Sequence, residues 1–142
     1  MNEYKLSDLS VGMTASFQKT ITLEDEEAFR KITGDLNPLH QNDSFANDIS
    51  NGKYKYHVSF GMLTASLYST IAGMYLPGKY SLIHSFDEVS FMKPVFVGDC
   101  LTVTGEITDK DDYLKMIKLK VVITNQYGKK VSRGQMKVIV MK

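Results

Sequence analysis

The first third of the chain predicts a strand followed by a helix. Residues 13–21 alternate between apolar and polar and are rich in β-prone types, which is typical of a strand. Thr22 and Asp25 have the spacing of a capping box, in which each residue satisfies a backbone N–H of the other. Gly34 follows as the glycine that commonly ends a helix. We therefore expect a helix between Thr22 and Gly34.

The two sides of this helix differ in character. Charged residues spaced four apart predict the ion pairs Glu26–Arg30 and Glu27–Lys31 on the solvent side. The apolar residues at helical spacing, which we expect to face the core, are Ala28, Phe29 and Ile32.

A second helix is predicted in the long uncharged stretch of residues 58–78. It should run over residues 60–75 and end at Leu76-Pro77-Gly78. The stretch approaches the roughly 20 residues that a bilayer span needs, but serine and threonine interrupt it repeatedly. A helix without a charged face is otherwise buried on most sides. We expect a buried helix and no membrane partner.

The last third changes to a β pattern. Its β-rich segments are separated by turn residues and cover residues 81–91, 101–108, 114–125 and 131–141. One strand, then helices, then four strands implies an antiparallel sheet, and a curved sheet around the uncharged helix would bury it. The pattern predicts an α+β protein with the hot-dog architecture, in a single domain over residues 1–142.

Composition and charge narrow the function classes. The net charge is +1 over 142 residues, so there is no strong electrostatic field that would favour binding to nucleic acid or to an anionic membrane. Cys100 is the single cysteine and cannot form an intramolecular disulfide, which suits a reducing compartment. Residues 1–10 lack the apolar run of a secretory signal. We expect a cytoplasmic protein.

The polar residues of the loop 35–40 are candidates for acid–base chemistry. His40 is a side chain that can exchange a proton at neutral pH, and Asp35 can orient a water or an imidazole. Fully extended, the intervening chain would separate them by roughly 17 Å, so a turn must bring them together. An alternative stays open, in which Asp35 and Asn37 only make local turn hydrogen bonds on the surface.

The start of the uncharged helix is a candidate anion site. The free N–H groups and positive dipole end of a helix favour negative charge, and Gly61 would let an oxygen approach the backbone closely. An enolate-like thioester oxygen is a suitable guest. The alternative is a glycine that only eases packing, with Ser66 bonded to the preceding helical turn.

Several sequence blocks resemble the MaoC-like and (R)-specific enoyl-CoA hydratase family. Residues 34–40 (GDLNPLH), with Ala46 after them, resemble the hydratase motif. Residues 61–67 (GMLTASL) resemble the start of the family's central helix. Weaker matches follow at residues 76–78 (LPG) and 91–99 (FMKPVFVGD), and the blocks occur in the family's order.

The resemblance implies a hot-dog fold, a dimer or higher homo-oligomer, and a trans-2-enoyl thioester substrate. Asp35 and His40 would be the catalytic pair and share the water that adds to C3. The Gly61 N–H would bind the thioester oxygen, with Asn37 and Ser66 in supporting roles. This chemistry needs no metal and no redox cofactor.

Two features affect the substrate. Family members commonly have histidine immediately before the helix glycine, and this chain has Phe60 there, which changes the surroundings of the oxyanion site. Lys79 and Lys93 are candidates for contact with the phosphates of coenzyme A. Acyl chain length, and coenzyme A against acyl carrier protein as the carrier, stay open.

Two other functions compete with hydration. A hot-dog thioesterase would need a carboxylate or water aimed at C1, whereas the segment from Asp35 to His40 offers two water-binding groups. A non-catalytic acyl-thioester-binding protein would be favoured by the loss of Asp35 or His40, and both are present.

Overall fold

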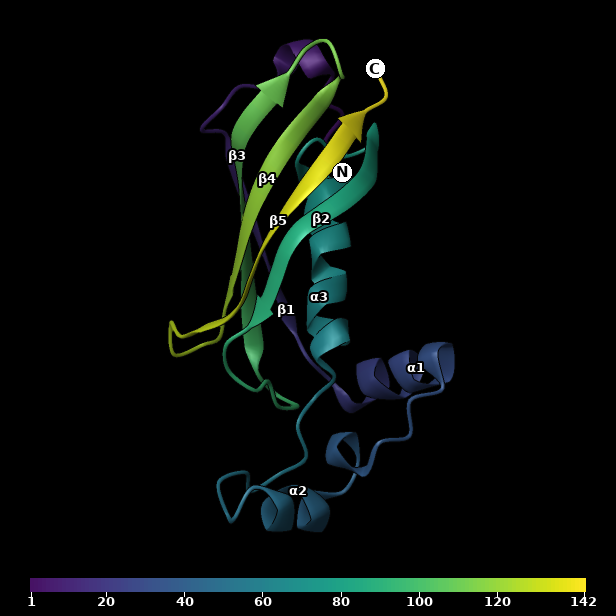
Figure 1. Ribbon diagram of the computed structural model, residues 1–142, viewed down its shortest axis with the longest axis vertical. Helices are drawn as coiled ribbons and strands as arrows, with labels where there is room; N and C mark the ends of the chain where they lie inside the picture. Colours follow the sequence, from purple (N-terminus) through teal and green to yellow (C-terminus); the bar gives the residue numbers. More distant parts are fainter.

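A curved sheet wraps one side of a long helix (Figure 1). The computed structural model describes all residues, 1–142. The five strands are wholly antiparallel in the order β1-β3-β4-β5-β2. Their bounds are β1 Thr14–Thr20, β2 Ser81–Phe91, β3 Cys100–Asp111, β4 Met116–Thr124 and β5 Lys130–Val140. The predicted α+β hot-dog architecture is confirmed.

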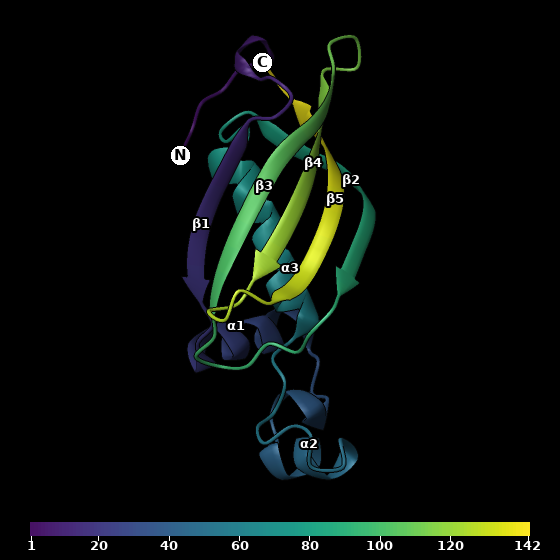
Figure 2. The same ribbon diagram turned by 90° about the vertical axis from the view of Figure 1, so that its left-hand side faces the viewer.

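The helices lie on one side and at one end of this sheet. Figure 2 shows α3 behind the sheet, with α1 and α2 beyond one end of the strands. The helices are α1 Leu23–Thr33, α2 Asp43–Ile49 and α3 Gly61–Thr70, and α3 continues as a π-helical turn, Ile71–Tyr75. None of them is both long enough and apolar enough to cross a lipid bilayer.

Two glycines let α3 lie close against the sheet. A Cβ on Gly105 of β3 would stand 2.9 Å from the Ile71 side chain, and one on Gly134 of β5 would stand 3.2 Å from the Tyr68 ring. Alternate residues of β3, β4 and β5 complete the core against Tyr68 and Ile71. This close packing fixes the direction of α3 and so the place where its first turn meets the loops.

The helix α3 is buried on one side only, so the expectation that it is almost wholly buried is wrong. Met62 is 62% exposed, and Ser66, Ser69 and Met74 are also exposed. These residues recur at helical spacing on the side that the sheet does not reach. This side carries no charged residue, so the five-stranded sheet leaves an uncharged face of the helix uncovered.

The first helix follows its predicted bounds but buries different residues. Thr22 and Asp25 form the capping box, and Gly34 ends the helix with a left-handed backbone, both as predicted. The buried residue is Glu26, whereas Ile32 is 81% exposed and Ala28 is exposed too. The Glu26 carboxylate pairs with the imidazole of His57, from another segment, and not with Arg30. The predicted Glu26–Arg30 pair therefore does not form.

Candidate functional site

The turn at Pro38–His40 holds the His40 imidazole against the segment that leads into α3. Asn37 caps this turn, since its side-chain oxygen accepts the Leu39 N–H at 3.0 Å. His40 Nδ1 lies 2.7 Å from the carbonyl oxygen of Val58. A carbonyl only accepts, so Nδ1 carries the hydrogen and Nε2 keeps its lone pair in the neutral ring. The ring also packs on Phe60, with 4.4 Å between centroids.

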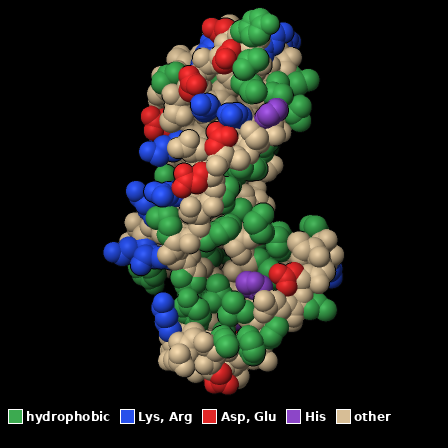
Figure 3. All heavy atoms as spheres, viewed as in Figure 1, with side chains coloured by type: hydrophobic (Ala, Val, Ile, Leu, Met, Phe, Trp, Pro, Cys, Tyr) green, Lys and Arg blue, Asp and Glu red, His purple; other side chains and the backbone are tan.

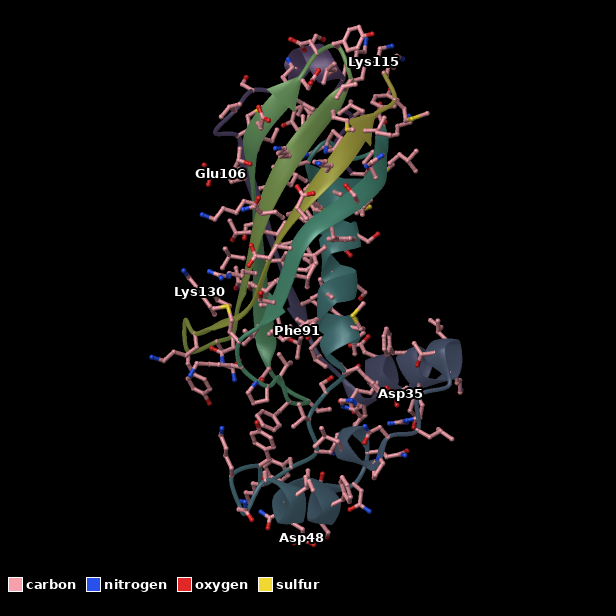
Figure 4. The ribbon with its side chains drawn as sticks, in the orientation of Figure 1. Asp35, Asp48, Phe91, Glu106, Lys115 and Lys130 are labelled. Carbon is pink, nitrogen blue, oxygen red and sulfur yellow. The ribbon has the colours of Figure 1, made fainter.

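Asp35 lies in the loop after α1 and is exposed in the protomer (Figure 4). Its Oδ1 accepts the Asn37 N–H at 2.9 Å, which is the local turn bond considered above. Asp35 is absent from the wall of the pocket that contains His40. The pairing of Asp35 with His40 through one water therefore stays a prediction.

His40 and Gly61 share a pocket of about 380 Å³ at the start of α3. The N–H groups of Gly61 and Met62 have no acceptor, as is usual for the first turn of a helix. A Cβ on Gly61 would stand 3.4 Å from the Phe91 ring. The wall is formed by Leu39, His40, Tyr54, Val58, Ser59, Gly61, Thr64, Phe91, Met92, Lys93, Pro94, Val95 and Val131. A histidine base and the free N–H of Gly61 thus meet in one apolar pocket.

Two buried hydroxyl groups in this wall escaped the sequence reasoning. Ser59 is 3% exposed and Thr64 is 2% exposed, and neither hydroxyl has a hydrogen-bond partner. The two residues flank the helix start at the positions where a pair of apolar residues often packs together. Two hydroxyl residues at that spacing, either side of a predicted helix start, are the signal that could have found them.

A second, larger cavity of about 600 Å³ runs along the uncovered side of α3. Ser66 lies in this apolar groove and not in the His40 pocket, and its hydroxyl donates to the Leu63 carbonyl at 2.6 Å. Phe91 lines both cavities, so they are neighbours. The other residues of the groove are Phe29, Thr33, Met62, Ala65, Tyr68, Ser69, Ile83, Phe86 and Val89.

The two candidate lysines lie at different places. Lys93 lines the His40 pocket. Lys79 lies beyond the far end of the central helix, where its Nζ pairs with Glu3 at 3.0 Å. That ion pair raises the pKa of Lys79. A role for either in coenzyme A binding stays a prediction, and Lys93 has the better position.

Beside the pocket, His57 bridges two carboxylates from different helices. Its Nδ1 lies 2.6 Å from Asp43 of α2, and its Nε2 lies 3.0 Å from Glu26 of α1. Burial lowers the pKa of His57, but hydrogen bonds to Asp43 and Glu26 outweigh burial and raise it above its ordinary value. The backbone N–H and ring of His57 lower the pKa of Asp43. We call Glu26, His57 and Asp43 the histidine clamp.

Comparisons with known proteins agree with the fold and the motif. The chain matches the MaoC like domain over residues 9–128. It is 39% identical to an (R)-specific enoyl-CoA hydratase of Aeromonas caviae over 100 residues, 70% of this chain and 72% of that one. It is 32% identical to the enzyme of the same name from Rhodospirillum rubrum over 133 residues, 94% of this chain and 89% of that one.

A solved structure extends the likeness to nearly the whole fold. The (R)-hydratase from A. caviae involved in PHA biosynthesis superimposes with a TM-score of 0.85 at 33% identity, covering 93% of this chain and 97% of that one. The match over residues 9–128 covers the strands β1 to β4, the central helix and the His40 loop. The chain belongs to the MaoC-like family.

Proposed function

We propose that this protein catalyses the reversible hydration of trans-2-enoyl thioesters to (R)-3-hydroxyacyl thioesters. The observation that carries the proposal is the His40 pocket, where an imidazole with a free Nε2 and the unpaired N–H of Gly61 line one apolar cavity. Relatives that are 32% to 39% identical to this chain are named (R)-specific enoyl-CoA hydratase and 3-hydroxybutyryl-CoA dehydratase.

The proposed reaction adds one water across the double bond. His40 Nε2 takes a proton from the water while the oxygen forms a bond to C3, and Asp35 orients that water. The electron pair of the double bond moves toward the thioester oxygen, where the N–H of Gly61 stabilises the enolate charge. The proton that Nε2 took from the water is then delivered to C2 on the same face, which returns the His40 ring to its neutral form. No electrons are gained or lost, so we propose no redox cofactor, and because the imidazole and the helix N–H supply the acid–base and charge-stabilising groups we propose no metal.

Crotonyl-CoA distinguishes hydration from the competing functions. The wild-type protein should remove the enoyl absorbance of crotonyl-CoA without releasing a free thiol. Release of coenzyme A would indicate a thioesterase instead. Binding of acyl-CoA with neither reaction would indicate a binding protein. Acyl-carrier thioesters, tested beside the coenzyme A thioesters, identify the preferred carrier.

We also propose a homodimer formed through the edge strand β2. An edge strand presents unpaired backbone groups, and β2 pairs only with β5. Hydrophobic side chains gather along β2 and the start of α3 in Figure 3. Those of β2 that are exposed are Leu82, Phe86 and Phe91. A second protomer on this face would cover the apolar groove and bring further groups toward Ser66.

A charge placed in the centre of this face should separate the protomers. Phe86 is 47% exposed in the apolar groove, so in Phe86→Asp a dimer would have to bury an unpaired carboxylate. We expect the variant to sediment as a monomer with reduced hydratase activity. Tyr113→Asp, in the exposed turn between β3 and β4, is the matched control and should stay dimeric. A wild-type monomer that is fully active would contradict the proposed dimer.

The remaining proposals concern location and substrate contact. We propose that the protein acts in the cytoplasm, where its single Cys100 would stay reduced. Among the basic residues, Lys93 at the pocket wall is our first candidate for a coenzyme A phosphate.

A further inference from the structure

We propose that Glu26, His57 and Asp43 are positioning residues that hold His40 in its reactive tautomer. The inference deepens the proposed hydratase function and rests on it. None of the three side chains lines the His40 pocket, so their effect must pass through the backbone of the segment that leads into α3. That segment carries both His57 and the carbonyl of Val58 that His40 contacts.

The clamp is built of three elements that meet around one imidazole. The Glu26 side chain is 2% exposed, and its Oε2 contacts the ring while its Oε1 has no partner. Asp43, in the first turn of α2, accepts both the His57 ring Nδ1 at 2.6 Å and the His57 backbone N–H at 2.8 Å. Residue 57 is therefore fixed at its backbone and at both ring nitrogens.

With both carboxylates ionised, the contacts need a charged imidazole. Ionised carboxylates only accept hydrogen bonds, so both ring nitrogens must donate, which only the imidazolium does. A buried Glu26 carboxylate also needs an opposite charge beside it. The charged groups that face the ring are Glu26 from α1 and Asp43 from α2. Arg30 of α1 lies one turn beyond Glu26 and points instead at the Phe60 ring and the His40 carbonyl.

Two hydrogen bonds of Val58 connect the fixed backbone of His57 to His40 and its neighbour Leu39. The Val58 N–H donates to the Leu39 carbonyl at 3.0 Å, and the Val58 carbonyl accepts from His40 Nδ1 at 2.7 Å. The segments around residues 39–40 and 57–58 are thus joined through both the N–H and the carbonyl of Val58. If the clamp opens, the Val58 carbonyl loses its fixed direction, and the His40 hydrogen can move to Nε2, where it blocks the base.

Long-range ¹H–¹⁵N NMR of the imidazole rings measures directly which ring nitrogens carry a hydrogen. The chain has three histidines, His40, His57 and His84, so one substitution at each assigns the spectrum. We expect a His57 protonated on both nitrogens above neutral pH and a His40 protonated on Nδ1. In Glu26→Gln and His57→Gln, the His40 signals should move toward a mixture of tautomers. His84→Gln, whose ring contacts only the exposed Ser85 hydroxyl, should leave His40 unchanged.

Kinetics give the second readout. Glu26→Gln and His57→Gln should each lower kcat for crotonyl-CoA by about 10-fold to 100-fold, the range seen when groups that orient metal-bound histidines are removed. KM should change little, because the clamp does not line the pocket. The double variant should lose no more than the worse single variant, since the two groups act as a unit. Asp43→Asn should give a smaller loss, and its control on the same helix is Asp48→Asn.

The outcomes separate this proposal from the proposed function. A wild-type His57 that is neutral at pH 7 overturns the clamp, as do folded Glu26→Gln and His57→Gln proteins with unchanged His40 tautomer and kcat. If these variants do not fold, the protonation of His57 in the wild-type spectrum and the effect of Asp43→Asn, at an exposed residue, still test the clamp. A wild type without hydratase activity refutes the proposed function, while the His40 tautomer still tests whether the clamp positions that ring.

Discussion

His40→Ala should lower kcat for enoyl-thioester hydration by about 10²–10⁴-fold, the contribution typical of a general acid–base group. The imidazole lies in the pocket with its Nδ1 hydrogen held by the Val58 carbonyl, which leaves Nε2 as the base. Alanine removes that base and leaves the free N–H groups of α3 in place. The half-buried ring packs on Phe60, so circular dichroism must confirm that the variant is folded.

Asp35→Asn should cause a loss of the same order if Asp35 shares the reacting water. The exposed position of Asp35 means that its removal should cost little stability. Because the two groups act on one water, the double variant should lose little more than the worse single variant. Asp48→Asn, also an exposed aspartate, should keep full activity. Near-normal turnover in both His40→Ala and Asp35→Asn would contradict this mechanism.

His57→Ala should destabilise the protein by about 3–5 kcal/mol, the cost typical of removing one partner of a buried ion pair. The variant leaves the Glu26 carboxylate buried without its imidazolium. The pKa of His57 is raised in the folded protein, so its stabilisation is complete below the ordinary value of 6.5 and is lost as the pH rises through the raised pKa. The difference from wild type should therefore be larger at pH 6 than at pH 9.

Urea unfolding at both pH values measures this difference. The protomer concentration must be the same throughout, because a dimer makes apparent stability depend on concentration. Tyr113→Ala is the control, since Tyr113 is 93% exposed in the turn between β3 and β4, away from β2, and should change the free energy of unfolding by about 0.5 kcal/mol or less. A loss in His57→Ala that is equal at pH 6 and pH 9 would contradict the charged state of the clamp.

The strands, the caps of α1 and the central helix could be predicted because their causes are local. Alternating residues, the Thr22–Asp25 capping box and the glycine at residue 34 act within a few positions of one another. The hot-dog arrangement followed because a helix without a charged residue needs a sheet against it. The motif around His40 indicated the family through its residue types. How these residues are arranged in space could not be derived from their spacing along the chain.

The errors arose where a distant segment decides the environment. Glu26 was expected to face solvent as the partner of Arg30, but His57, far along the chain, provides a better partner and buries it. Ile32 was expected in the core, but the sheet does not extend over that side of α1. Ser66 lies in the apolar groove on the uncovered side of α3, a place that its spacing from Gly61 did not indicate, and its supporting role stays a prediction. Such pairings depend on the tertiary fold and leave no local signal.

Hydration of crotonyl-CoA in D₂O, with the product's configuration resolved at both carbons, tests the central claim most directly. The account predicts (R)-3-hydroxybutyryl-CoA from the wild-type protein, with one deuterium at C2 on the face that receives the hydroxyl. The His40→Ala protein should form this product about 10²–10⁴-fold more slowly. Free coenzyme A in place of the hydroxyacyl thioester, or addition of hydroxyl and deuterium to opposite faces, would contradict it.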